Sequence, residues 1–165
     1  VSSTKEKFTC MPDPPPSAIG LGMSGIYANA NIEKSQVQLV ENIMLSVGKT
    51  LLLENEDDIN TVIAAAGSSP AYFFLIAQVM QQATIDMGLT KSAARLLVEQ
   101  AMLGSATLIC NSGHLELSEL RSQVTSKGGT TAKAIESLQS DNIEEIFTRA
   151  MQAAVARSKE MSEQF

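Results

Sequence analysis

The sequence contains few aromatic residues, cysteines and histidines. Aromatic side chains make up 4% of the 165 residues and Trp is absent, so Met and Ala must supply much of the core volume. Cys10 and Cys110 are too few to staple a chain of this size, which favours a reducing compartment. The single His114 has no recognisable acidic partner or nucleophile, so no Ser-His-Asp triad is indicated. Its spacing from Cys110, without further ligands, does not indicate a metal site, and we predict none.

Positive charge and long apolar runs are also scarce. Lys and Arg number 12 against 18 Asp and Glu, and the net charge of -6 gives no general attraction to nucleic acid or anionic lipid. The longest apolar run, residues 71–79, is interrupted by Gln78 and is shorter than the roughly 20 residues that span a membrane. Residues 1–8 are polar and charged, unlike the apolar core of a secretory signal. We expect a soluble, cytoplasmic protein without nucleic-acid or membrane partners.

The hydrophobic content of 44% is sufficient for one compact domain, or for one domain with part of another. In the first third, a helix pattern begins at the expected cap Asn31 and extends to about Val47, before Gly48. Pro-rich residues 12–16 exclude regular structure there. The predicted strands cover residues 7–11, 22–28 and 50–53. We interpret residues 1–53 as the end of an α/β unit, with no sheet to join within this chain.

From Glu54 onward the pattern is helical. Ser69 followed by Pro70 is a typical start for a long helix, and Thr90 is a typical cap for the next one. The predicted helices cover residues 58–66, 69–88, 90–113, 117–124, 131–139 and 143–163. We therefore predict a mainly α fold, with an all-helical domain over residues 54–165.

The helix predicted at residues 69–88 carries apolar residues on too many faces for a small bundle. The residues that cover most of its circumference are Phe73, Phe74, Leu75, Ile76, Val79 and Met80. A helix that is apolar nearly all round must be buried nearly all round, which a unit of roughly 110 residues can hardly achieve alone. The pattern predicts a large subunit interface. The alternative is the central helix of a monomeric bundle.

Residues 20–25 match the G-x-G-x-x-G pattern of dinucleotide-binding loops. That fingerprint holds a pyrophosphate only where a strand delivers the glycines to the start of a helix. Here a proline-rich turn precedes the glycines, and the β-prone residues 26–28 follow them. We therefore do not interpret these glycines as a cofactor site.

The segment Gln-Val-Thr-Ser-Lys-Gly-Gly-Thr-Thr, residues 123–131, is the strongest candidate site. Two consecutive glycines permit positive φ and a close approach of a ligand, and the helix that follows presents unpaired amides. The neighbouring hydroxyls donate or accept hydrogen bonds. The pattern predicts an anion site suited to a carboxylate, formed by Thr125, Ser126, Gly128, Gly129, Thr130 and Thr131. The alternative is a helix cap with a flexible approach.

Several motifs, in order along the chain, together resemble pyrroline-5-carboxylate reductases. Met-Pro-Asp-Pro-Pro at residues 11–15 resembles the family's M-P-N-T-P turn, and Gly-Ser-Ser-Pro-Ala-Tyr at 67–72 resembles part of S-G-S-G-P-A-Y. Val-Thr-Ser-Lys-Gly-Gly-Thr-Thr at 124–131 resembles V-[CT]-S-P-G-G-T-T. The resemblance extends from Met11 to Met161 and corresponds to the C-terminal part of the family's chain.

This resemblance implies an enzyme that reduces 1-pyrroline-5-carboxylate to L-proline. It implies a helical dimerisation domain like the C-terminal domain of 6-phosphogluconate dehydrogenase, preceded by the end of a Rossmann domain over residues 1–53. It also implies a homodimer through residues 54–165, with the substrate between the nicotinamide and the loop of opposite subunits. NADP(H) or NAD(H) is then bound mostly by an N-terminal half that this sequence lacks, and the fragment alone is expected to be inactive.

The family's substrate contacts correspond to positions in the glycine-containing loop. The resemblance implies that Ser126 and the amides of Gly129, Thr130 and Thr131 hold the substrate carboxylate, through charge-assisted hydrogen bonds. It also implies that the Thr131 hydroxyl bonds the ring nitrogen, which makes Thr131 the expected catalytic residue.

The resemblance places the expected cofactor contacts at Met11, Pro12 and Asp13. Asp13 and Pro14 replace the family's Asn and Thr there, and a carboxylate is a poor substitute for an amide donor. Lys127 replaces the usual Pro of the loop, and its charge either attracts a carboxylate or faces solvent. Two alternatives to this enzyme are a non-catalytic helical interaction module and an imine reductase with another small substrate.

Overall fold

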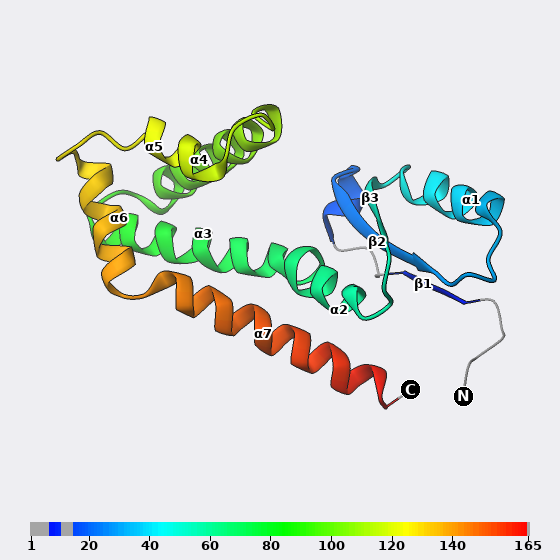
Figure 1. Cartoon of the computed structure of the whole chain (residues 1–165). Helices are drawn as coiled ribbons and strands as arrows, with labels where there is room; N and C mark the ends of the chain where they lie inside the picture. The colour runs from blue at the N-terminus through cyan, green and yellow to red at the C-terminus, as the bar shows by residue number, and fades with distance from the viewer. Residues whose placement is uncertain (1–6, 11–14, 165) are drawn as a thin grey trace. The chain divides into compact units, whose positions relative to one another are not determined.

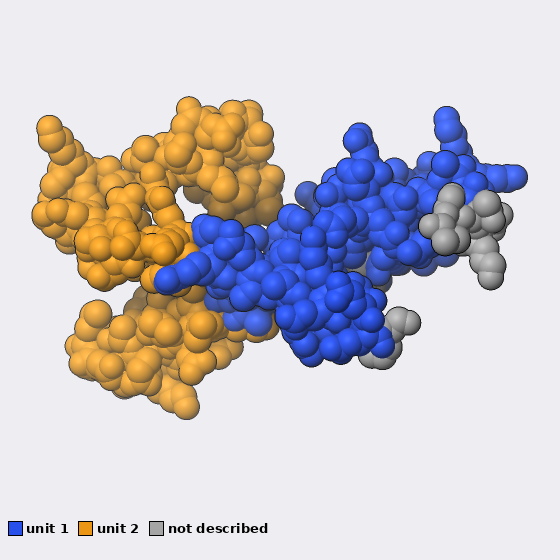
Figure 2. Space-filling view, turned by 60° about the horizontal axis from the view of Figure 1, so that its bottom comes forward, with its two compact units in different colours: residues 1–72, 148–165 blue, residues 73–147 orange. Residues whose placement is uncertain are grey.

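The computed structural model describes residues 7–10 and 15–164. The chain forms two compact units, coloured separately in Figure 2: residues 1–72 with 148–165, and residues 73–147. The helices are α1 (Lys34–Met44), α2 (Asp58–Val62), α3 (Ser69–Asp86), α4 (Lys91–Asn111), α5 (Leu117–Gln123), α6 (Thr130–Ser140) and α7 (Ile143–Ser162). Two short turns of other helix types are η1 (Pro15–Ile19, 3-10) and η2 (Ile63–Gly67, π). The predominance of helices confirms the predicted mainly α fold.

The first unit contains a three-stranded sheet (Figure 1). Its strands are β1 (Phe8–Cys10), β2 (Gly22–Ala28) and β3 (Gly48–Leu53), in the order β1-β2-β3. β1 is antiparallel to β2, whereas β2 and β3 are parallel and connected through α1. The expectation that these strands have no sheet to join within the chain was wrong. β2 has two edges that form hydrogen bonds, and β1 and β3 occupy one each.

Both faces of β2 are covered within the first unit. Gly25 lies against α2, where an added Cβ would come within 2.9 Å of a Val62 methyl carbon. The neighbouring Ser24 is buried and pairs with Thr50 of β3, whose hydroxyl donates to Glu41 of α1. Successive strand residues point to opposite faces, so α1 covers one face of the sheet and α2 covers the other.

The glycines of the G-x-G-x-x-G pattern belong to β2 and the turn before it. Gly22 pairs with Gly48, and a Cβ on Gly48 would collide with the Gly22 backbone. A strand therefore follows the first glycine where the dinucleotide fingerprint requires a helix. Of these glycines, Gly22 serves the close packing of two strands.

Glu33 caps α1, two residues after the predicted cap Asn31. The Glu33 amide donates to Gln36 Oε1 at 2.9 Å, and the Glu33 side chain accepts from the Gln36 amide, which completes a capping box. Asn31 lies in the preceding turn, where its amide donates to Asn29 Oδ1 at 3.2 Å. The two reciprocal bonds at Glu33 satisfy more helix donors than a single asparagine cap.

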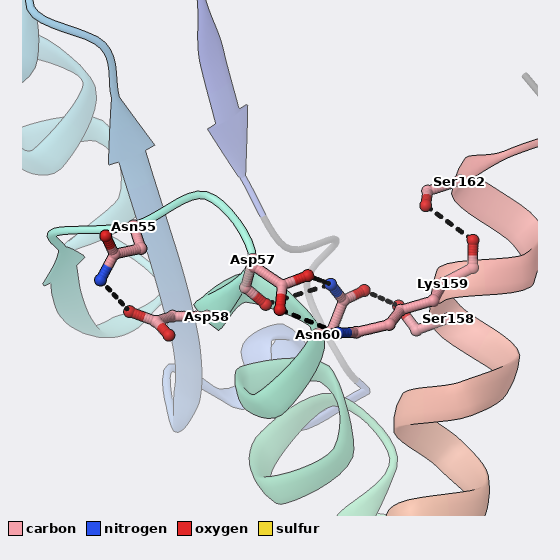
Figure 3. A network of polar contacts seen from close by, with 7 residues as sticks. All are labelled: Asn55, Asp57, Asp58, Asn60, Ser158, Lys159 and Ser162. Carbon is pink, nitrogen blue, oxygen red and sulfur yellow. Dashed lines mark hydrogen bonds and ion pairs between the residues drawn. The ribbon is translucent and has the colours of Figure 1, made fainter.

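Polar contacts connect the start of α2 to the C-terminal part of α7 within the first unit (Figure 3). Lys159 Nζ donates to Asp57 Oδ2 at 2.8 Å, and the Ser158 hydroxyl donates to Asn60 Oδ1 at 2.7 Å. The hydrogen bond from Lys159 lowers the pKa of the Asp57 carboxyl below its ordinary value. Two segments that are far apart in sequence are therefore joined by charge-assisted and neutral hydrogen bonds.

Glu56 makes a second polar connection, from the start of α2 to β1. Its Oε1 accepts from Lys7 Nζ and from the Thr9 hydroxyl, both at 2.7 Å. The hydrogen bond from Lys7, and then the one from Thr9, lower the pKa of the Glu56 carboxyl. The adjacent acidic residues Glu56 and Asp57 thus bind different elements of the first unit.

The second unit leaves most of the apolar surface of its long helices uncovered. Thr90 caps α4 as predicted, because its hydroxyl accepts from the Ala93 amide at 3.3 Å. The fully buried residues among 73–147 are Ala94, Val98, Ser112 and Leu120. Phe74 of α3 is 64% exposed, and α3 has no buried residue. The alternative that this is the central helix of a single-chain bundle was therefore wrong.

Two helical stretches are long and apolar enough to cross a membrane, judged by length and composition alone. They are Asp58–Asp86 and Lys91–Asn111, each only 11% buried within the chain. The sequence expectation relied on uninterrupted apolar runs, and isolated polar residues such as Gln78 break those runs without making the whole helix polar. The same composition is typical of helices that pack against a second subunit.

Candidate functional site

The loop between α5 and α6 contains a tight turn over residues 126–129. The Gly129 amide donates to the Ser126 carbonyl at 3.0 Å, and Gly128 has a φ of 74°. Lys127 is not among the described residues with positive φ, of which Asn142 is the sole non-glycine member. This combination is typical of a type II β-turn with Lys127 and Gly128 at the central positions. Its second central position favours glycine because L side chains rarely adopt that φ.

The backbone of Gly129 lies against the Ser126 side chain. A Cβ added to Gly129 would collide with Ser126 Oγ and come within 3.2 Å of Ser126 O. Gly129 is also the N-cap of α6, in an extended conformation. The two glycines therefore have different roles: Gly128 turns the chain, and Gly129 lets the Ser126 hydroxyl lie close to the start of the helix.

The first turn of α6 has donors without partners. No side chain caps it, and the amides of Thr130 and Thr131 have no acceptor within the helix. Within residues 7–10 and 15–164, the hydroxyls of Ser126, Thr130 and Thr131 have no hydrogen-bond partner either. Thr130 and Thr131 are exposed. Together these groups form an open set of donors at the positive end of a helix dipole, which suits an anion.

Two predicted members of the site are engaged within the loop itself. The Thr125 hydroxyl donates to the Arg121 carbonyl at 2.6 Å, and the Gly129 amide is used in the turn with Ser126. The bonded donors are adjacent in sequence to the free ones, so the spacing of the motif does not show which donors are bonded and which are free. The donors that remain available to a ligand are the Ser126 hydroxyl and the amides and hydroxyls of Thr130 and Thr131, in the first turn of α6.

The loop is locally basic in a chain with net charge -6. Residues 122–135 contain Lys127 and Lys133 but no Asp or Glu. Lys133 pairs with Glu136 at 2.6 Å. Lys127 is exposed, and its ammonium has no ion-pair partner in the described part of the chain. The charge of the loop therefore complements the anion that its donors suit.

Met11, Pro12 and Asp13, the expected cofactor contacts, lie outside the described residues. Cys110 and His114 are both exposed, and the described residues contain no group of three or more side chains suited to hold a metal ion. The described candidate site therefore consists of hydrogen-bond donors that suit an anion.

A pocket of about 270 Å³ between α4 and α5 was not predicted. Its lining residues are Ser105, Leu108, Ile109, Leu117, Leu120, Arg121 and Val124. Arg121 also holds Thr125 through its carbonyl, so the pocket and the loop share a residue. The signal in the sequence is the helical spacing of these positions, three or four residues apart on each helix.

A family model described as pyrroline-5-carboxylate reductase dimerisation matches residues 56–161. The chain belongs to this family. The match begins at Glu56, before α2, and ends within α7, so it includes the turn at residues 126–129 and the exposed apolar helices α3 and α4.

Relatives over a longer part of the chain carry the same family name. A pyrroline-5-carboxylate reductase from Vibrio alginolyticus is 48% identical over 150 residues, which cover 91% of this chain and 55% of the relative. One from Pasteurella multocida is 40% identical and covers 99% of this chain and 59% of its own length. The chain therefore spans somewhat more than half the length of the curated reductases it matches.

Solved structures of this family have the same fold. A pyrroline-5-carboxylate reductase from Coxiella burnetii has a TM-score of 0.89 and 40% identity, with 96% of this chain and 58% of that chain covered. The Plasmodium falciparum pyrroline carboxylate reductase with NADP bound has a TM-score of 0.87 and 27% identity, over 98% of this chain and 60% of that chain. These matches extend to the sheet of the first unit, outside the family model.

Proposed function

We propose that this chain is part of an enzyme that reduces 1-pyrroline-5-carboxylate to L-proline with NADPH or NADH. Relatives named pyrroline-5-carboxylate reductase, which match over 91% to 100% of the chain, support the activity. The NADP in the name of the Plasmodium structure supports a nicotinamide cofactor. When bound, the nicotinamide supplies the hydride.

One observation carries the chemical part of the proposal: the uncapped first turn of α6, beside the free Ser126 hydroxyl. A carboxylate there accepts from the amides of Thr130 and Thr131 and from Ser126, while the helix dipole favours its charge. The ring nitrogen of the same small substrate then faces the Thr131 hydroxyl. That hydroxyl orients the imine and bonds the nitrogen as electron density moves onto it.

We assign to this chain the binding of the substrate rather than the binding of the cofactor's pyrophosphate. The described glycines of the G-x-G-x-x-G pattern lie in and before β2 and do not fit a pyrophosphate. The proposed contacts of Met11, Pro12 and Asp13 with the nicotinamide rest on the family resemblance. The chain's own residues hold the carboxylate, orient the ring and bond its nitrogen.

We assign the exposed apolar faces of α3 and α4 to a homodimer interface within residues 54–165. Phe73, Phe74 and Leu75 are each more than half exposed, as are Leu97 and Leu103 of α4. Apolar surface of this kind is typical of obligate subunit interfaces. The description of the family model as a dimerisation region supports the same assignment.

The activity is tested in the full-length protein with Thr131→Val and Thr131→Ser. Removing the hydroxyl is expected to lower kcat/KM for pyrroline-5-carboxylate roughly 10- to 150-fold, since a hydrogen bond to a charged group contributes about 1.5 to 3 kcal/mol. Thr131→Ser keeps the hydroxyl and should retain most of the rate. Full turnover by Thr131→Val would remove Thr131 from the mechanism, and absence of turnover by the wild type would refute the proposed activity.

A further inference from the structure

Lys127 occupies a position that the turn does not require to be lysine. In a type II turn the first central residue needs only negative φ, its amide is not used in the turn, and proline is common there. Gly128, with φ 74°, and the hydrogen bond from Gly129 to Ser126 set the turn. A lysine at position 127 therefore adds a charge to a turn that forms without it.

The ammonium of Lys127 has no competing partner. Residues 122–135 contain no acidic side chain, and the one other cation among them, Lys133, is paired with Glu136. The Lys127 side chain is exposed and precedes the free donors of α6 by three residues. In a chain of net charge -6, this segment is a local reversal of sign.

We infer that Lys127 is a specificity-determining residue that attracts the substrate carboxylate to the first turn of α6. The inference rests on the proposed function, because it names a further group acting on the same substrate. The family pattern quoted above has proline at this position, so the charge at residue 127 is an addition to the backbone site. Long-range attraction favours acidic over neutral ring compounds, and the backbone amides then fix the orientation.

Three substitutions at residue 127 separate charge from turn rigidity. Lys127→Gln removes the charge and keeps a long side chain, Lys127→Pro removes the charge and favours the turn, and Lys127→Glu reverses the charge. For the neutral variants KM for pyrroline-5-carboxylate should rise roughly 1.4- to fivefold, the range of an exposed charge interaction, with kcat nearly unchanged. Lys127→Glu should raise KM further.

Ionic strength gives a readout that a structural role would not move. The difference in kcat/KM between wild type and Lys127→Gln should shrink between about 0.05 M and about 0.5 M salt, because salt screens exposed charges. Lys133→Gln is the matched control, since it also removes one positive charge, but from a lysine of α6 that is already paired with Glu136. Equal changes in both variants would indicate a net-charge effect and overturn the inference.

Ligand binding distinguishes this inference from the proposed activity. In the full-length protein, Lys127→Gln and Lys127→Pro should weaken binding of L-proline severalfold, measured by titration calorimetry. Both variants should leave unchanged the binding of L-prolinamide, in which a neutral carboxamide replaces the carboxylate. If the wild type binds proline in this Lys127-dependent way without reducing the imine, the activity fails and the inference stands. Normal turnover with unchanged KM in all three variants would refute the proposed role of Lys127 and leave the proposed activity intact. Absence of proline binding by the wild type would also refute the role of Lys127.

Discussion

The two units of the chain use their apolar residues differently. In the first unit Ile26 and Ala64 are each 1% exposed, and helices cover both faces of the central strand. In the second unit Phe74 is 64% exposed, and four residues in the whole unit are fully buried. Burial of apolar area is the main favourable term in folding, so the second unit lacks within one chain the core that the first unit has.

This difference shows which region depends on a partner. The first unit has polar connections in addition to its core, such as those of Glu56 and Asp57. Its stability is therefore expected to come from contacts within one chain. The helices of the second unit present apolar faces that require a second surface. The catalytic loop proposed here belongs to the second unit, so its geometry is expected to depend on assembly.

The strongest test of the comparison is a charge in the exposed face of α3. Phe74→Glu is expected to weaken dimerisation by about 2 kcal/mol or more, because it removes an exposed aromatic residue from the proposed interface and places a carboxylate there. This corresponds to a Kd increase of roughly 30-fold or more, measured by analytical ultracentrifugation of the full-length protein. Monomers should appear at concentrations where the wild type is dimeric.

Leu39→Glu is the matched control for that experiment. Leu39 is 61% exposed, a fraction similar to the 64% of Phe74. It lies on α1 of the first unit, outside the segment that matches the dimerisation family. Its substitution should leave the Kd within about twofold, since Leu39 lies outside the segment that matches the dimerisation family. Equal weakening by both substitutions would show that the two faces do not differ as the comparison requires.

Local signals in the sequence predicted much of the helical region. The Thr90 cap, the start of α3 at Ser69 and the glycine turn at 128 depend on a few neighbouring residues, and each lies where predicted. The cap of α1 was misplaced, because the Glu33 capping box uses a pair of residues that the preference for a single asparagine does not reveal. Caps and turns that depend on a few neighbouring residues can thus be predicted from the sequence, but the choice between two adjacent candidate caps cannot.

The pairing of the strands and the availability of donors could not be read in the same way. β1 and β3 join β2 through residues far apart in the sequence, and pairing partners are not encoded by the pattern of one strand. In the loop, hydroxyls of the same type divide into used and free ones, since Thr125 bonds the Arg121 carbonyl and Thr131 bonds nothing in the described chain. The sequence therefore indicated the candidate loop, but not which of its donors are free to bind a ligand.

A pair of glycines sharpens the comparison between the units. Gly20 in the first unit and Gly128 in the second both have a φ of 74°, and an added Cβ would meet nothing within 4 Å at either position. Gly20→Ala and Gly128→Ala should therefore each cost about 1 kcal/mol of stability from backbone conformation alone. Only Gly128→Ala should also lower kcat/KM, by roughly tenfold or more, since it displaces the donors that position the substrate. Thermal melting and steady-state kinetics separate the two effects, and a similar loss of activity in both variants would contradict the proposed site.

The smallest expected effect is the pH dependence of the Glu56 connection in the first unit. Its folded-state pKa is lowered mainly by Lys7 and then by Thr9, so its contribution to stability is complete above the unfolded pKa of about 4.3 and is lost as pH falls through the lower folded value. The side chain is 39% exposed and the pair is screened, so Glu56→Gln should lower Tm by at most about 3 °C at pH 7. This difference should shrink as pH falls below the unfolded pKa and vanish below the lowered folded-state pKa, while Thr9→Val should show a weaker form of the same trend. A Tm difference that stays constant from neutral to acidic pH would mean that Glu56 stabilises the unit by packing alone.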